Sequence, residues 1–160
     1  MQEVTPSLVV SWLSIPEGSV EDLRRDLNKQ PLREAAVLKR IEREKQTLND
    51  LRQELRVKRL KLDQLVADKV LQFKEISEKP PSAAAVEAYR KYDLEKDPQV
   101  AALRADIVQL EGRIASQQLL VDSWVALYEK LRTKSMILMA NLKLEVALRM
   151  GNQNNLMEMI

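Results

Sequence analysis

The sequence feature that most constrains the fold is a heptad pattern of apolar residues between positions 98 and 150. Apolar residues recur there at alternating steps of three and four, which is the spacing of a coiled-coil seam. A helix of this length extends for roughly 75–80 Å and cannot bury its own apolar stripe. We therefore expect another helix to lie along it. The seam residues are Val100, Leu103, Ile107, Leu110, Ile114, Val121, Trp124, Tyr128, Leu131, Leu138 and Leu142.

A second heptad pattern predicts the partner helix over residues 31–77. Pro31 is expected to open this helix, because proline is tolerated at the first helical position. Two consecutive prolines, Pro80 and Pro81, end it. Asp97 then caps the helix that Pro98 starts. The apolar positions that support the partner helix are Ile41, Leu48, Leu51, Leu55, Leu62, Leu65 and Ile76.

Two helices of similar length, separated by about twenty residues, are expected to fold back as an antiparallel hairpin. If the numbers of facing residues add up to about 176, the apolar positions of the two helices meet. Lys58 then faces Gln117 in a polar layer that fixes the alignment.

The start of the chain carries two capping signals. Thr5 and Pro6 predict the N-cap and first position of a short helix, although the valines of residues 8–15 are almost as compatible with a strand. Ser19 and Asp22 resemble a capping box that starts a second short helix.

Towards position 150 the apolar residues cover more than one stripe. A two-helix hairpin buries one stripe, so the remainder needs a cover from elsewhere. We expect a ring-like homo-oligomer assembled through this end; the alternative is that the N-terminal segment with Trp12 folds over it within one chain. The candidate oligomerisation residues are Met136, Ile137, Met139, Leu142, Leu144, Val146 and Leu148.

These patterns predict an all-α fold: a long, coiled-coil-like antiparallel helical hairpin with a short N-terminal helical segment, assembled into a homo-oligomer. The expected divisions are a short helical segment over residues 1–30, a hairpin over 31–150 (first helix 31–77, connector 78–97, second helix 98–150) and a flexible tail over 151–160.

Composition limits the chemistry that the chain can perform. It has no cysteine and no histidine, which removes thiolate chemistry and the commonest general base and metal ligand. No glycine-rich phosphate loop occurs. We expect neither an enzyme nor a bound metal or cofactor. Apolar runs are too short for a membrane span, which predicts a cytoplasmic protein without membrane contact.

The net charge of only +2 means that nucleic-acid binding would depend on where the cations lie. The most one-sided stretch is RQELRVKRLK, which could follow the phosphates of a strand. The alternative is an ordinary solvated helix surface. Its cations are Arg52, Arg56, Lys58, Arg59 and Lys61, against the single acid Glu54.

Aromatic residues accompany a second basic group in the connector. Tyr89 and Tyr92 are three residues apart, hence neighbours on one helical face, and Arg90 and Lys91 lie between them. Aromatic faces beside cations can stack bases while the cations neutralise phosphates. The alternative is that both tyrosines pack onto the hairpin.

A third basic group, Lys130, Arg132 and Lys134, is spread around the second helix. In a ring, several copies could line a common surface with these cations.

Trp124 and Tyr128, like Trp12, are interpreted as packing residues.

Two stretches resemble the UvsY-like family of phage recombination mediators. The family's basic-x-basic-Leu-Asp motif, associated with single-stranded DNA binding, looks like residues 59–63, RLKLD. Its carboxy-terminal helix looks like the region from Asp97 and Val100 through Trp124 to Lys130, Arg132 and the apolar run at residues 136–138. The family's aromatic and glycine residues after that arginine are replaced here by Thr133, Lys134 and Ser135.

The resemblance implies a closed oligomer that binds single-stranded DNA in DNA recombination and repair, without ATP or metal. It implies loading of a RecA-type recombinase and displacement of single-strand-binding protein, in the host cytoplasm if the chain is phage-encoded. Another hypothesis is a coiled-coil structural, assembly or chaperone-like protein of a phage or secretion apparatus, with the Met-rich end as its working surface.

Overall fold

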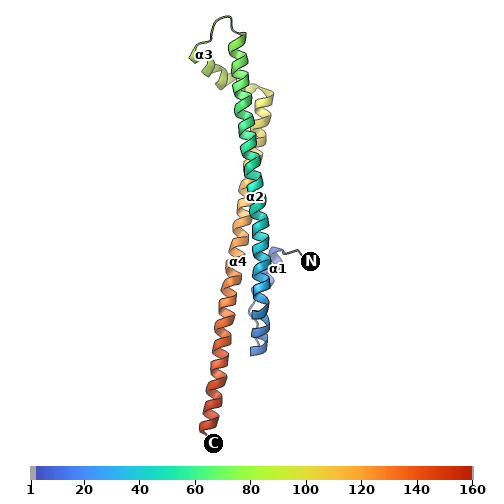
Figure 1. Cartoon of the computed structure of the whole chain (residues 1–160), viewed down its shortest axis with the longest axis vertical. Helices are drawn as coiled ribbons and strands as arrows, with labels where there is room; N and C mark the ends of the chain where they lie inside the picture. The colour runs from blue at the N-terminus through green and yellow to red at the C-terminus, as the bar shows by residue number, and fades with distance from the viewer. Residues whose placement is uncertain (1–2, 160) are drawn as a thin grey trace. The chain divides into compact units, whose positions relative to one another are not determined.

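The computed structural model describes residues 3–159 and is built of helices (Figure 1). Helix accounts for 88% of the described residues, and these residues contain no strand, which confirms the all-α prediction. The N-terminal segment adopts the helical alternative. The elements are α1 (Pro6–Ser11), α2 (Val20–Ile76), α3 (Ala83–Ala88), a π-helical turn (Tyr89–Asp93), a 3-10 turn (Leu94–Lys96) and α4 (Pro98–Glu158).

The chain forms two compact units. Unit 1 comprises Met1–Lys45 and Leu120–Ile160, and unit 2 comprises Gln46–Leu119. The long helices α2 and α4 each contribute a stretch to both units. Within each unit these stretches pack together, as the predicted helical pair requires.

The core of unit 1 has Trp124 at its centre, with only 1% of its surface exposed. Val9 of α1 is fully buried against this core, so the N-terminal segment packs on the helix pair. Arg40 of α2 helps to hold the segment, since its Nη1 lies 3.0 Å from Glu3 Oε1. Trp12 and Tyr128 pack partly buried at the edge, which confirms that the three aromatic residues are packing residues. The fully or nearly buried members are Val9, Val37, Ile41, Trp124 and Leu131.

The core of unit 2 lies where the connector meets the two helices. Val70 of α2, Leu94 of the 3-10 turn and Val100 of α4 are buried together. Phe73 and Tyr89 stack in parallel, with ring centroids 4.2 Å apart. The connector is thereby fixed to α2 by apolar packing.

All three predicted caps form. The Thr5 side chain accepts a hydrogen bond from the Leu8 amide at 3.2 Å. The Ser19 amide donates to Asp22 Oδ2 at 3.2 Å, and the Asp22 amide donates back to Ser19 Oγ.

At the start of α4, Asp97 Oδ1 accepts from the Gln99 and Val100 amides. A hydrogen bond from Lys69, joined by these amides, holds the pKa of Asp97 below its usual value.

Helix α2 begins at Val20, so the prediction that Pro31 opens the first long helix is wrong. Pro31 lies inside α2 with its side chain exposed. A proline inside a helix destabilises it by about 3 kcal/mol or more. Burial of side chains before and after Pro31 nevertheless favours one continuous helix. Leu23, Gln30 and Val37 are buried at intervals of seven. Because Gln30 is polar, the heptad pattern of apolar residues does not extend to positions before Pro31 in the sequence.

Residues 151–158 also differ from expectation. They continue α4 to Glu158 instead of forming a separate tail. Gly151 does not adopt the positive φ of a helix-ending glycine, so the helix passes through it.

The alignment of α2 and α4 in unit 2 is displaced by roughly one heptad from the predicted pairing. Lys58 Nζ lies 2.9 Å from Asp106 Oδ2, whereas the expected partner was Gln117. Arg52 donates to Gln118, and Arg59 pairs with Glu111. A shift by one heptad brings the same apolar faces together, so the seam itself does not decide between the two alignments.

Cysteine pairs can separate the two alignments, because the natural chain contains no cysteine. We expect a short bismaleimide reagent to join K58C to D106C efficiently within one chain. The matched pair K58C and Q117C should not be joined, since residues 106 and 117 lie roughly 16 Å apart along a helix. Mass spectrometry of the monomer band would contradict the observed alignment if only the second pair reacted.

Candidate nucleic-acid interface

The basic stretch of α2 in unit 2 is partly neutralised by α4. Arg59 Nη2 lies 2.6 Å from Glu111 Oε1, and Lys58 Nζ lies 2.9 Å from Asp106 Oδ2. Arg52 Nη2 donates to Gln118 Oε1 at 3.0 Å. Three of the five predicted DNA-binding cations in this stretch therefore also connect the two helices.

The other two cations of the stretch, Arg56 and Lys61, are exposed. Neither has an ion-pair partner in the part of the chain that the structure describes. Lys61 belongs to the RLKLD motif, and Arg59 of the same motif has 58% of its side chain exposed despite its ion pair. The available positive charge is thus concentrated on Arg56, Arg59 and Lys61.

The connector places its two tyrosines in different environments. Tyr89 stacks on Phe73, which supports packing for this ring, while Tyr92 is 59% exposed. The π-helical turn changes the angular spacing of residues, so the two rings do not act as neighbours on one face. Lys91 Nζ lies 5.6 Å from the centre of the Tyr92 ring, and Arg90 is exposed. An exposed aromatic ring beside two cations is compatible with base stacking.

The third basic group divides into exposed and buried residues. Lys130 and Arg132 are exposed, and the Arg132 guanidinium lies 5.9 Å from the centre of the Tyr128 ring. Lys134 is only 4% exposed, so its predicted contact with DNA does not fit this structure. Its ammonium group is engaged inside unit 1.

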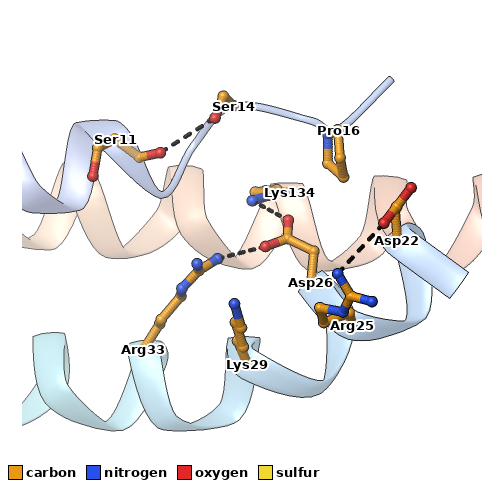
Figure 2. Close-up of a pocket in the computed structure, with 9 residues that line it drawn as sticks. All are labelled: Ser11, Ser14, Pro16, Asp22, Arg25, Asp26, Lys29, Arg33 and Lys134. Atoms are coloured by element: carbon orange, nitrogen blue, oxygen red, sulfur yellow. Dashed lines mark hydrogen bonds and ion pairs between the residues drawn. The ribbon is translucent and has the colours of Figure 1, made fainter. Parts of the chain in front are cut away.

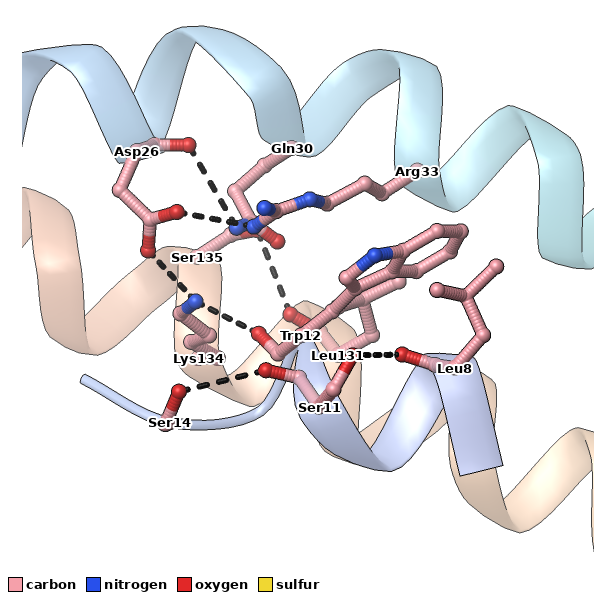
Figure 3. Close-up of polar contacts among 10 residues, drawn as sticks. All are labelled: Leu8, Ser11, Trp12, Ser14, Asp26, Gln30, Arg33, Leu131, Lys134 and Ser135. Carbon is pink, nitrogen blue, oxygen red and sulfur yellow. Dashed lines mark hydrogen bonds and ion pairs between the residues drawn. The ribbon is translucent and has the colours of Figure 1, made fainter. Parts of the chain in front are cut away.

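Lys134 belongs to a buried ionic cluster, which we define as Asp26, Arg33, Lys134 and the Trp12 carbonyl (Figure 3). Lys134 Nζ lies 2.5 Å from Asp26 Oδ2 and donates to the Trp12 carbonyl at 2.6 Å. Arg33 Nη1 lies 2.9 Å from Asp26 Oδ1. The ionic cluster therefore joins α2, α4 and the segment after α1.

Burial raises the pKa of Asp26, but the hydrogen bonds from Lys134 and Arg33 outweigh it and hold the pKa below its usual value of 3.8. Because the pKa of Asp26 is lower in the folded state than in the unfolded state, its carboxylate stabilises the fold fully at pH values above 3.8. This stabilisation is lost as the pH falls through the lowered pKa of the folded state.

A polar pocket of about 280 Å³ adjoins the ionic cluster (Figure 2). Its charges are largely paired, since Asp26 faces Arg33 and Lys134, and Arg25 lies 3.7 Å from Asp22. Sequence analysis missed Asp26 and Arg33, because no local pattern indicates a partner more than a hundred residues away. The pocket is lined by Ser11, Ser14, Pro16, Asp22, Arg25, Asp26, Lys29, Arg33 and Lys134.

Most candidate oligomerisation residues are exposed in the single chain. Met136 is 72% exposed and Leu144 is 59% exposed, while Leu142 and Val146 are half-buried. The segment after α1 reaches this group at Ile137, since Leu13 and Ile15 line an apolar groove of about 380 Å³ with it. Farther along α4, Arg24 of α2 lines a second groove with Leu142 and Val146. Met139, Leu144 and Leu148 remain exposed.

None of the helices in residues 3–159 has a stretch long and apolar enough to cross a membrane.

Comparisons with family models, curated proteins and solved structures give no match to this chain.

Proposed function

We propose that this chain is a recombination mediator that binds single-stranded DNA as a homo-oligomer. In this role it promotes loading of a RecA-type recombinase and displaces single-strand-binding protein. The observation that carries the proposal is the exposure of three cations, Arg56, Arg59 and Lys61, within about one and a half turns of α2, with Arg56 and Arg59 on the same face. The likeness of RLKLD to the mediator motif is the second support.

The connector in the same unit supplies the other ingredients of a single-strand site. Arg90 and Lys91 offer cations for phosphates, and the exposed Tyr92 ring offers a face for one base. Stacking on an aromatic ring contributes roughly 1–3 kcal/mol per base and tolerates any sequence. A protein that organises DNA for a recombinase needs this lack of sequence preference.

Self-association raises the affinity for DNA of a protein that offers only a few exposed cations per chain. One chain carries a net charge of only +2, so a single copy attracts phosphate weakly. Several copies that hold one strand raise the effective concentration of each next contact. Because the strand is then already extended and ordered, a recombinase that binds it loses less conformational entropy.

Fluorescence anisotropy with a labelled oligonucleotide tests the proposal. We expect salt-sensitive binding by the natural chain at about 50 mM salt. Substituting both Arg56→Ala and Lys61→Ala should weaken binding and reduce the slope of log affinity against log salt by about 0.7 per lost contact.

The matched control is the pair Lys39→Ala and Lys45→Ala, which removes the same charge from exposed positions of α2 in unit 1. This control should bind more tightly than the Arg56 and Lys61 variant. Absence of salt-sensitive binding by the natural chain would contradict the proposal.

A second candidate function is a coiled-coil assembly or chaperone-like protein. It is favoured by the exposed thioether and leucine side chains near the end of α4, because methionine adapts to varied apolar partners. Met136, Met139 and Met150 are 72%, 49% and 60% exposed. Capture of a defined client that requires Met136 and Met139, but tolerates loss of Arg59 and Lys61, would favour this function over DNA binding.

A further inference from the structure

We propose that Asp106 and Glu111 of α4 act as internal competitors of DNA phosphate for Lys58 and Arg59. This inference rests on the proposed function and adds a regulation of the same surface. Each carboxylate forms an ion pair with a cation that a DNA phosphate would contact. When the strand binds, the phosphate must therefore replace the carboxylate as the partner of that cation. The acids of α4 would then set how tightly the hairpin holds DNA.

The geometry of the Arg59 pair allows such an exchange. Arg59 Nη2 and Glu111 Oε1 are 2.6 Å apart, yet the side chains remain 58% and 46% exposed. A phosphate can therefore approach the guanidinium from solvent without unfolding the helix pair. Arginine presents several donors in a planar fork, which suits an exchange of carboxylate for phosphate.

The Lys58 pair is more enclosed on one side. Lys58 is 27% exposed, whereas its partner Asp106 is 53% exposed, with 2.9 Å between Nζ and Oδ2. Glu54, Asp106 and Arg113 line a small crevice around this ammonium group. Lysine has a single compact charge, so we expect its exchange to contribute less than that of Arg59.

Exposed ion pairs are weak, which places the exchange in a measurable range. Removing one competing carboxylate should raise affinity for DNA about two- to fivefold. The two acids are five residues apart in α4, so neutralising both should raise affinity more than neutralising either one alone.

The test uses Glu111→Gln in the full chain, titrated with a labelled oligonucleotide at about 50 mM salt, where electrostatic binding is strong. Glu75→Gln is the matched control, because it removes the same charge from an exposed position of the same unit, sixteen residues from Arg59. We expect Glu111→Gln to bind more tightly than Glu75→Gln. Equal affinities would overturn the inference.

A double-mutant cycle identifies the exchange itself. Arg59→Ala should weaken binding more in the Glu111→Gln background than in the natural chain, since Arg59 is then free for phosphate. Arg59→Ala in the Glu75→Gln background should weaken binding by the same factor as in the natural chain. Additive effects in both backgrounds would overturn the inference, while binding by the natural chain would leave the proposed function standing.

Asp106→Asn with Lys58→Ala provides a second, independent cycle, and circular dichroism checks that each variant stays helical. Coupling in either cycle supports the exchange. A natural chain that fails to bind the oligonucleotide, together with variants that also fail, would overturn both the inference and the proposed function.

Discussion

Replacing Trp124 with alanine is expected to lower the free energy of unfolding by about 3–5 kcal/mol. Trp124 is 1% exposed and packs in the core of unit 1 with Val9, Ile41 and Leu131. The substitution removes a large apolar side chain and leaves a cavity that the surrounding helices fill only in part. Urea unfolding monitored by circular dichroism measures the loss.

The control for this substitution is Leu119→Ala, because Leu119 has 69% of its surface exposed. It should change stability by no more than about 0.5 kcal/mol. A Trp124→Ala variant that unfolds at the same urea concentration as the Leu119→Ala variant would contradict the packing of unit 1.

The second large effect is expected for Lys134→Ala, at about 2–4 kcal/mol of unfolding free energy. The substitution removes the partner of the buried Asp26 carboxylate and the donor to the Trp12 carbonyl. Arg33 still pairs with Asp26, which keeps the expected cost below that of a fully abandoned charge. Thermal and urea unfolding measure the difference.

Lys130→Ala is the matched control, since Lys130 is an exposed lysine one turn earlier in α4. It should change stability by no more than about 0.5 kcal/mol. Adding Asp26→Asn to Lys134→Ala should recover part of the stability, because a neutral amide no longer needs a cation. If Lys134→Ala were as stable as Lys130→Ala, the ionic cluster would have no structural role.

Local sequence signals predicted the helix starts well. The Thr5, Ser19 and Asp97 caps each depend on residues within three positions, and all three form. The all-α fold followed from heptad patterns that extend over many residues, so single exceptions did not obscure them. Short-range chemistry of this kind is visible in a sequence.

The errors arose where distant residues decide the structure. A heptad pattern repeats every seven residues, so it could not exclude the one-heptad shift that pairs Lys58 with Asp106. Pro31 is predicted as a helix start because proline is tolerated at the first helical position, whereas burial of Leu23, Gln30 and Val37 against other parts of unit 1 keeps α2 continuous through it. Lys134 is predicted as a DNA contact from its neighbours in sequence, but it is buried, because its partner Asp26 belongs to another helix.

The candidate interface was predicted in part. The exposed cations Arg56 and Lys61 could be identified from charge and helical spacing. The partners of Lys58 and Arg59 could not, since they depend on the alignment of α4 beside α2. The different environments of Tyr89 and Tyr92 depend on the π-helical turn, which no sequence pattern indicated.

We propose that this helical protein assembles with copies of itself and binds single-stranded DNA. Size-exclusion chromatography with light scattering, with and without a single-stranded oligonucleotide, tests it most directly. We expect a mass that is a multiple of the 18.4 kDa chain and joint elution with the oligonucleotide. A single 18.4 kDa species that elutes apart from the oligonucleotide at low salt would contradict the claim.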